Sequence, residues 1–172
     1  QHLKEVIRGA LKSFLFHIKV RNFLFQITYI YRMKMIYIIR HAKSDWSIDG
    51  LSDIDRSLNG RGYSDAHNMG RAMKLKGYSP EIMISSPAIR ALSTGLIIAE
   101  ELMFPKSEIR IEPRLYETGV DEYLKVIKQV DEGINSVAIF GHNPIVSDLA
   151  SHWAGQLIEM PTCAVVRIKF LN

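Results

Sequence analysis

The stretch MIYIIRHAKSDW (residues 35–46) is the part of the sequence that decides the fold. Its first five residues are apolar throughout and rich in β-formers, which is typical of a strand that is covered on both faces. The run then ends abruptly in Arg40, His41 and Lys43. Burying a charge without a partner is expensive. These side chains therefore either point into water at the strand end or meet an anion there.

Further along the chain, short apolar segments recur. They occupy residues 35–39, 82–84 and 137–140, and residues 163–170 form a last segment that alternates towards its end. The first three segments read as buried strands, and the alternation of the last one indicates a strand near an edge of the sheet. We therefore expect one sheet that is built from all four segments.

Longer amphipathic segments separate these strands. Helices are predicted over residues 59–77, 86–102, 121–130 and 143–155. Asn59 is expected to cap the first helix and Gly77 to end it, while Ser86 as N-cap and Pro87 at the first helical position begin the second. Alternating strands and helices predict an α/β fold, a three-layer α/β/α sandwich with a mainly parallel (mixed) sheet.

Several ionisable side chains follow the ends of these strands. Arg40 and His41 end the first strand, Arg90 lies just beyond the second, and His142 follows the strand at 137–140. Ligand sites in such sheets lie at the carboxyl ends of the strands. Helix N-termini present unpaired N–H groups there, and the planar guanidinium of arginine matches phosphate oxygens. The pattern thus predicts a bound anion, and a phosphoryl group fits best.

Composition and charge narrow the class of protein. The chain has 172 residues with 47% hydrophobic content, enough for one globular domain. Its one cysteine, Cys163, excludes an internal disulfide framework and fits a reducing compartment, so a cytoplasmic location is expected. No apolar run reaches the roughly 18 residues of a membrane span. We expect no membrane association of the core and a monomer.

The N-terminal segment differs from the rest in charge. Residues 1–32 hold six Lys/Arg and one Glu, whereas the remainder holds 16 Lys/Arg and 17 Asp/Glu. The basic character thus belongs to this segment, and the core gives no reason to expect nucleic acid. We interpret residues 1–32 as a leader outside the domain, with a targeting role or a structural extension as alternatives, and residues 33–172 as the domain.

Five motifs carry a resemblance to a known family. The segments are RHAKSDW, DIDRSLNGRGYSDA, SSPAIRALST, LYE and GHNP, in this order. They resemble the successive motifs of the histidine phosphatase superfamily, whose fold is phosphoglycerate-mutase-like. The RHAKS form and the short chain are most similar to phosphohistidine phosphatases of the SixA type. The resemblance covers roughly residues 34–170.

The resemblance implies a role for each matching residue. His41 is expected to be the nucleophile that forms a phosphohistidine intermediate. Arg40, Arg90 and His142 are expected to bind the phosphoryl oxygens and to stabilise charge in the transition state. It implies no metal and no cofactor, because arginines carry the compensating charge.

Two positions match the family pattern less closely. Ser47 stands where many members have a phosphate-binding asparagine, and we assign it to phosphate binding although serine is shorter. Glu117 fits the position of the proton donor of the family, yet SixA-type members often dispense with this acid. Its alternative is a carboxylate that balances Arg114.

Three functions remain open. The first is a phosphohistidine phosphatase that acts on a protein, and the second is a general phosphomonoesterase of small molecules. The third is a non-catalytic phosphate-binding module, against which the intact Arg40, His41, Arg90 and His142 argue. Each implies a phosphorylated protein or a small phosphorylated substrate as partner. Phosphoglycerate mutase activity is not expected, because the chain lacks longer insertions.

Overall fold

The computed structural model describes residues 35–170. Its centre is a five-stranded sheet with the order β3-β2-β4-β1-β5. The strands are β1 (Met35–Arg40), β2 (Ile82–Ser85), β3 (Arg110–Ile111), β4 (Ser136–Gly141) and β5 (Val165–Lys169). The first four strands run parallel, and β5 pairs with β1 antiparallel at the edge. The prediction of a mixed, mainly parallel sheet is confirmed.

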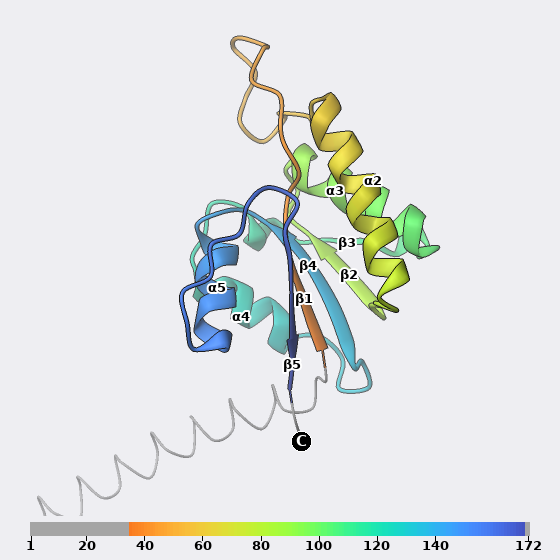
Figure 1. Cartoon of the computed structure of the whole chain (residues 1–172). Coiled ribbons are helices and arrows are strands. Elements are labelled where there is room, and N and C mark those ends of the chain that lie inside the picture. The colour runs from red at the N-terminus through yellow and green to blue at the C-terminus, as the bar shows by residue number, and fades with distance from the viewer. Residues whose placement is uncertain (1–34, 171–172) are drawn as a thin grey trace, which may run out of the picture.

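Helices cover both faces of this sheet. They are α2 (Gly60–Leu75), α3 (Ile89–Leu102), α4 (Val120–Lys128) and α5 (Ile145–Ala154), with short 3₁₀ turns at Lys106–Glu108 and Pro113–Leu115. Helices α2 and α3 lie on one side of the sheet and α4 and α5 on the other (Figure 1). The predicted three-layer α/β/α sandwich is therefore confirmed.

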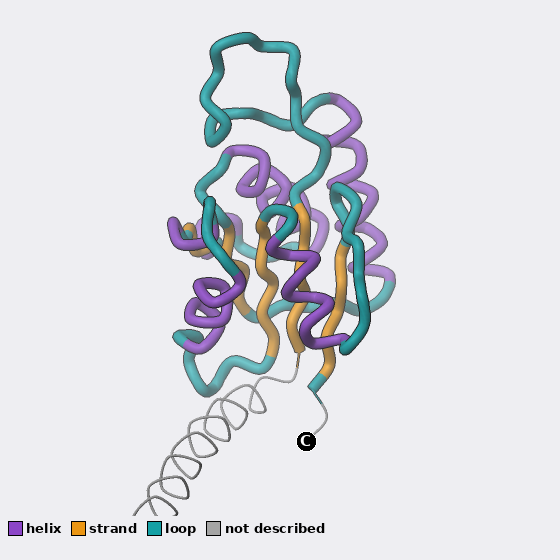
Figure 2. The backbone as a smooth tube through the Cα atoms, turned by 90° about the vertical axis from the view of Figure 1, so that its left-hand side faces the viewer, coloured by secondary structure: helices purple, strands orange, loops and turns teal. Residues whose placement is uncertain are grey.

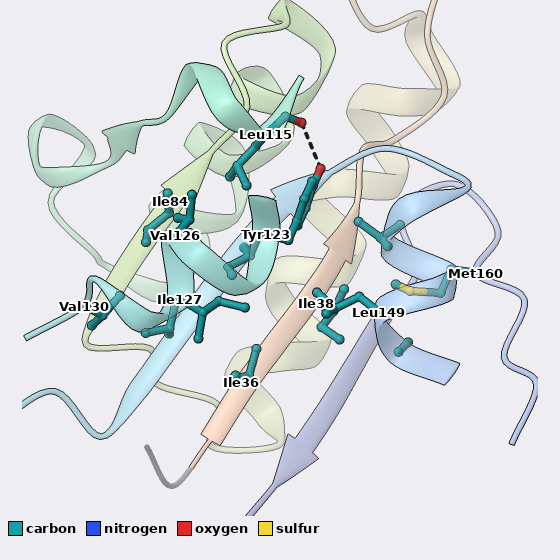
Figure 3. Close-up of a cluster of buried hydrophobic side chains, with 14 residues drawn as sticks. Ile36, Ile38, Ile84, Leu115, Tyr123, Val126, Ile127, Val130, Leu149 and Met160 are labelled. Carbon is teal, nitrogen blue, oxygen red and sulfur yellow. Dashed lines mark hydrogen bonds between the residues drawn. The ribbon is translucent and has the colours of Figure 1, made fainter. Parts of the chain in front are cut away.

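Strand β1 shows how the sequence builds these layers. Ile36 and Ile38 pack into the cluster beneath α4 and α5, while Tyr37 and Ile39 pack against α2 and α3. Successive strand residues point to opposite faces, so an unbroken apolar run supplies both layers. Burying each such side chain stabilises the fold by roughly 1.5–3 kcal/mol. Figure 3 shows the first cluster, in which the Tyr123 hydroxyl donates to the carbonyl of Leu115 at 2.9 Å.

The predicted helix starts are right in one case and wrong in another. Asn59 caps α2 by accepting a hydrogen bond from the Gly62 N–H at 2.8 Å. Ser86 does not cap α3, which begins at Ile89 and has Ala88 in the N-cap position without a side-chain bond. The Ser86 hydroxyl is engaged instead by a histidine from another strand end, a contact that the local pattern does not reveal.

A loop between β1 and α2 projects beyond the carboxyl end of the sheet (Figures 1 and 2). We call residues 45–57 the outer loop. Its base is closed because Ser44 pairs with Leu58 and the Asp45 N–H donates to the Ser57 carbonyl at 2.9 Å. The Ile89 N–H donates to the Ile54 carbonyl at 2.9 Å, which ties the loop to the start of α3.

Two of our expectations concern the ends and the environment of the chain. The interpretation of residues 1–32 as a leader falls outside the described residues, so it stays a prediction. Within residues 35–170, no helix is both long and apolar enough to cross a membrane.

Candidate active site

Adjacent parallel strands bring two histidines together at the carboxyl edge of the sheet. Strands β1 and β4 pair in a register that sets Arg40 opposite Gly141, and the His41 N–H donates to the Gly141 carbonyl at 3.1 Å. The residues that follow each strand are therefore neighbours. The ring centroids of His41 and His142 lie 5.1 Å apart. The two histidines therefore lie together at the strand ends, as the sequence predicted.

The His41 ring is held in one defined state. Its Nδ1 lies 2.7 Å from the carbonyl oxygen of Ala42, which can only accept a hydrogen bond, so we assign the proton to Nδ1. Burial above all, together with the charges of Arg90, Arg40 and Arg56, lowers the pKa of His41 to about 4, although the hydrogen bond to the Ala42 carbonyl raises it. At neutral pH the ring is neutral, and its Nε2 carries a free lone pair. This is the form that a nucleophile requires.

His142 is held by the loop that follows β2. Its Nε2 lies 2.8 Å from the Ser86 hydroxyl, whereas its Nδ1 is buried and has no partner among the described residues. Burial is the main cause that lowers the pKa of His142 to about 3, followed by the charge of Arg90. The preceding Gly141 leaves room for a close approach, since a Cβ there would lie 2.2 Å from the Tyr123 hydroxyl.

Three arginines from three segments surround the histidines. Arg40 ends β1, Arg90 lies in the first turn of α3, and Arg56 comes from the outer loop. Arg90 is 5% exposed and Arg56 9%, values that are rare for arginine. Arg40 donates from Nη1 to the Met160 carbonyl at 2.8 Å, and burial lowers its pKa. The positive charge of each arginine lowers the pKa of His41, so all three lie close enough to interact with this ring.

The hydrogen bonds of these arginines are incomplete. In residues 35–170, five buried side-chain atoms lack a hydrogen-bond partner: Nε of Arg40, Arg56 and Arg90, Nη1 of Arg56, and Nδ1 of His142. All five belong to this one cluster. Buried polar groups are almost always paired, so a group of unpaired donors around one histidine is typical of a site that binds an anion.

Asp53 of the outer loop connects two of the arginines. It accepts from Arg90 Nη2 at 2.7 Å and from Arg56 Nη2 at 2.5 Å, and its backbone carbonyl accepts from Arg90 Nη1. The Tyr116 hydroxyl also donates to its carboxylate, at 2.9 Å. Burial by itself would raise the pKa of Asp53, but these hydrogen bonds and the two positive charges hold it below its usual value.

A cavity of about 240 Å³ opens beside this cluster, and Asp53, Arg90, Tyr116, Glu117 and His142 are among the residues that line it. Glu117 has φ 51°, a left-handed conformation that non-glycine residues rarely adopt. Tyr116 packs edge-on against His142, with 5.7 Å between ring centroids. Burial, Asp53 and Glu117 raise the pKa of Tyr116 to about 12, so its hydroxyl keeps its proton. The lining of the cavity thus combines the guanidinium of Arg90 with the carboxylates of Asp53 and Glu117.

Most of the predicted site residues lie together. Arg40, His41, Arg90 and His142 form the cluster, and Glu117 lines the adjoining cavity. Ser47 is not part of it: it is exposed in the outer loop, and its N–H donates to the Asp45 carboxylate at 2.8 Å. Its surroundings give no support to the predicted phosphate contact, because the loop turns Arg56 rather than Ser47 towards the histidines.

Sequence reasoning missed Asp53 and Arg56. Both lie in or beside the segment DIDRSLNGRGYSDA, which carried the family resemblance but gave neither residue a role. One signal was available: Arg56 is the single cation among four aspartates in residues 45–57. Its burial could not be read from that pattern.

Two further predictions concern metals and the cysteine. Among residues 35–170, no group of three or more His, Cys, Asp or Glu side chains is placed to hold a metal ion. Cys163 is buried, and burial raises the pKa of its thiol to about 12. A protonated, buried thiol is unreactive and is typical of a structural cysteine.

Comparison with known proteins identifies the family. The model of the histidine phosphatase superfamily (branch 1) matches residues 36–133, more than half of the chain. The chain belongs to the histidine phosphatase superfamily. The family resemblance read from the five motifs is confirmed, and membership supports a phosphatase enzyme.

Solved structures extend this result to the SixA type. The superfamily member described here is similar to a proposed phosphohistidine phosphatase SixA from Agrobacterium tumefaciens, with a TM-score of 0.70 and 25% identity over 80% of this chain and 92% of that one. A protein histidine phosphatase SixA solved with tungstate has a TM-score of 0.67 at 24% identity, covering 77% of this chain and 86% of that one, and it shows the same fold. The predicted phosphoglycerate-mutase-like, SixA-type architecture is confirmed.

Sequence relatives are less informative about activity. An uncharacterised chloroplast protein of Arabidopsis thaliana is 27% identical over 76% of this chain, which spans 63% of that protein. A 2,3-bisphosphoglycerate-dependent phosphoglycerate mutase of Methylobacterium radiotolerans is 30% identical over 49% of this chain and 41% of its own length. This superfamily member therefore spans less than two thirds of these relatives.

Proposed function

We propose that this protein is a phosphatase that works through a phosphohistidine intermediate on His41. The observation that carries the proposal is the set of unpaired guanidinium edges around a neutral imidazole. A phosphoryl group would satisfy these donors, because its oxygens match the arginine fork. The lone pair on Nε2 of His41 would then face phosphorus.

The reaction divides into two transfers. In the first, Nε2 of His41 forms a bond to phosphorus while the bond from phosphorus to the leaving group breaks, and the leaving group departs with the bonding electrons. In the second, water attacks the phosphorus of the phosphohistidine while the bond from phosphorus to Nε2 breaks, and the bonding electrons return to Nε2. The attacking water loses a proton, orthophosphate is released and neutral His41 is regenerated. Such transfers depend on positioning and on charge more than on covalent assistance.

The surrounding residues would stabilise the charge on the transferred group. Arg40, Arg90 and His142 would bind its oxygens, as the family resemblance implies, and Arg56 would join them through its two unpaired nitrogens. Preorganised donors of this kind are worth about 10²–10³-fold each in rate. With three guanidinium charges available, we propose that the reaction needs no metal ion.

For the substrate, we propose a phosphohistidine carried by a protein. The SixA-type architecture supports this choice. A specific observation favours the alternative, a small phosphate ester: Glu117 lines the cavity with Arg90 and His142, where it could protonate a leaving alkoxide. An imidazole leaves more easily and depends less on such an acid.

The test compares two substrates and two variants. Turnover is measured on a phosphohistidine peptide and on alkyl and aryl phosphate esters, with Glu117→Gln and the control Glu122→Gln, whose carboxylate lies on α4 and pairs with Lys125. Loss of a positioned acid costs about 10²–10⁴-fold. We expect Glu117→Gln to lose ester hydrolysis far more than phosphohistidine hydrolysis, and Glu122→Gln to match the wild type.

Other outcomes would change the conclusion. Equal, large losses on both substrates would favour the general phosphomonoesterase. No loss on either would remove Glu117 from the mechanism. A wild-type protein that binds phosphate but turns over neither substrate would leave a phosphate-binding module.

A further inference from the structure

Asp53 has the contacts of a residue that organises the arginines. Arg56 and Arg90 are both almost fully buried, and two buried like charges repel one another unless a partner lies between them. The two oxygens of the Asp53 carboxylate supply that partner: Oδ1 accepts from Arg56 at 2.5 Å and Oδ2 from Arg90 at 2.7 Å. One carboxylate thus joins an arginine of the outer loop to an arginine of α3.

The same contacts fix the direction of both guanidinium groups. Each arginine binds Asp53 through Nη2, and Arg90 adds a second bond from Nη1 to the Asp53 carbonyl. A guanidinium is planar and rigid, so holding its Nη end decides where the Nε edge points. The Nε atoms of both arginines remain buried and unpaired, as does Nη1 of Arg56. Asp53 therefore binds the Nη2 end of each arginine and leaves the Nε edge of each without a partner.

Asp53 is itself held from several sides. The Tyr116 hydroxyl donates to Oδ2 at 2.9 Å, and the Ile89 N–H binds the carbonyl of the next residue, Ile54. The Trp46 ring stacks on Arg56, with its centroid 3.4 Å from the guanidinium carbon. Although the Asp53 side chain is 46% exposed, its carboxylate thus has partners from α3, from the cavity wall and from the outer loop itself.

We propose that Asp53 is the positioning residue that assembles the anion site of this protein. It brings Arg56 and Arg90 together and aligns their free edges towards the phosphoryl group. The inference rests on the proposed function, in which these arginines bind that group. The experiment separates this positioning role from the opposite one, in which the Asp53 carboxylate competes with phosphate for the arginines. The two roles predict opposite effects on affinity.

The experiment measures the affinity for inorganic phosphate and vanadate by calorimetry. Asp53→Asn keeps the size of the side chain and removes its charge. Because hydrogen bonds to charged groups are worth about 1.5–3 kcal/mol, we expect phosphate binding to weaken by about 10- to 100-fold. The matched control is Asp55→Asn in the same loop, since Asp55 is exposed and accepts from Ser52 at 2.6 Å. It should bind phosphate as the wild type does.

Two milder variants separate positioning from general support of the fold. Asp53→Glu keeps the charge and should recover part of the phosphate affinity. Tyr116→Phe removes the hydrogen bond that the neutral Tyr116 hydroxyl donates to the Asp53 carboxylate. Because Asp53 keeps its bonds to both arginines, phosphate binding should weaken by only about 2- to 10-fold. Should Asp53→Asn fail to fold, wild-type affinity in both of these variants would overturn the proposal.

The remaining outcomes distinguish this inference from the proposed function. Unchanged or tighter phosphate binding by Asp53→Asn overturns the assignment of Asp53 and leaves the phosphatase proposal standing. A wild-type protein that binds phosphate without turnover contradicts the phosphatase and leaves Asp53 in its role. A wild-type protein that binds neither phosphate nor vanadate overturns both.

Discussion

The site has two halves that are built in different ways. One half is the pair of strand ends that carry His41 and His142, which the β1–β4 register places side by side. The other half is the outer loop, which carries Asp53 and Arg56 and reaches the histidines through contacts with α3 and Tyr116. The first half follows from hydrogen-bonded geometry, and the second depends on how one loop closes.

This difference matters for how the site can be changed. A strand end is fixed by a ladder of backbone bonds beneath it, so a substitution there alters chemistry and leaves the position intact. The outer loop is fixed at its base by the Ser44–Leu58 bridge and at its far end by side-chain contacts. Substitutions in the loop should therefore alter position first and chemistry second. The predictions below test this contrast.

The largest effect is expected at a strand end. His41→Ala should abolish turnover, because no other side chain of the cluster is placed to accept the phosphoryl group. Rapid quenching with labelled substrate should trap acid-labile phosphate on the wild type and none on this variant. Label on a serine or an aspartate of the wild type would contradict the mechanism.

A comparison of Arg90→Ala, at the start of α3, with Arg56→Ala, in the outer loop, tests how much the outer loop contributes to catalysis. Arg90→Ala should slow turnover by at least about 10²-fold, the usual cost of one preorganised donor. Arg56→Ala should cost less, since Arg56 has the smallest of the three arginine effects on the pKa of His41. Steady-state kinetics on one substrate decide the order. A larger loss for Arg56 would show that the outer loop contributes more to the site than the start of α3 does.

The lowered pKa values of the two histidines predict a loss of stability in acid. The pKa is about 4 for His41 and about 3 for His142 when folded, against 6.5 in an unfolded chain. Between these values the unfolded state binds more protons, so the free energy of unfolding falls as the pH falls. From pH 7 to pH 5 the loss is roughly 2 kcal/mol for each histidine.

Urea denaturation at the two pH values measures this loss. His142→Gln serves as the control, because it removes one titrating group and should show a smaller difference between pH 7 and pH 5. If the variant and the wild type lose equal stability, His142 is not held neutral by its surroundings.

The smallest effect concerns the base of the outer loop. A Cβ at Gly62 would lie 2.1 Å from the Lys43 carbonyl oxygen, whereas a Cβ at Gly60 would meet nothing within 4 Å. Gly62→Ala should destabilise the protein by about 1–3 kcal/mol, as overpacking against backbone does. Gly60→Ala, two residues before the clash in the same helix, should stabilise it by roughly 0.5–1 kcal/mol. Thermal unfolding of both variants gives the sign, and equal signs would show that α2 does not rest on Lys43.

The sequence by itself determined the layers and half of the site. The apolar run before Arg40 and His41 could only be a strand buried on both faces, and parallel strands collect their carboxyl ends at one edge. Arg40, His41 and His142 were therefore predictable as neighbours. Arg90 and Glu117 were identified through the family motifs as well, although the start of α3 was misplaced because Ser86 binds His142 instead of capping the helix.

Only the tertiary structure decided which residues of the outer loop enter the site. Ser47, Asp53 and Arg56 all lie in one irregular segment, where no repeat relates spacing to direction. Pairing at the loop base and the contact between Ile54 and Ile89 turn Arg56 and Asp53 inward and leave Ser47 outside. These contacts join residues that are far apart in the chain, so local sequence patterns cannot predict them. In a strand, side chains alternate between the two faces, so the sequence predicts where each one points. A loop has no such repeat.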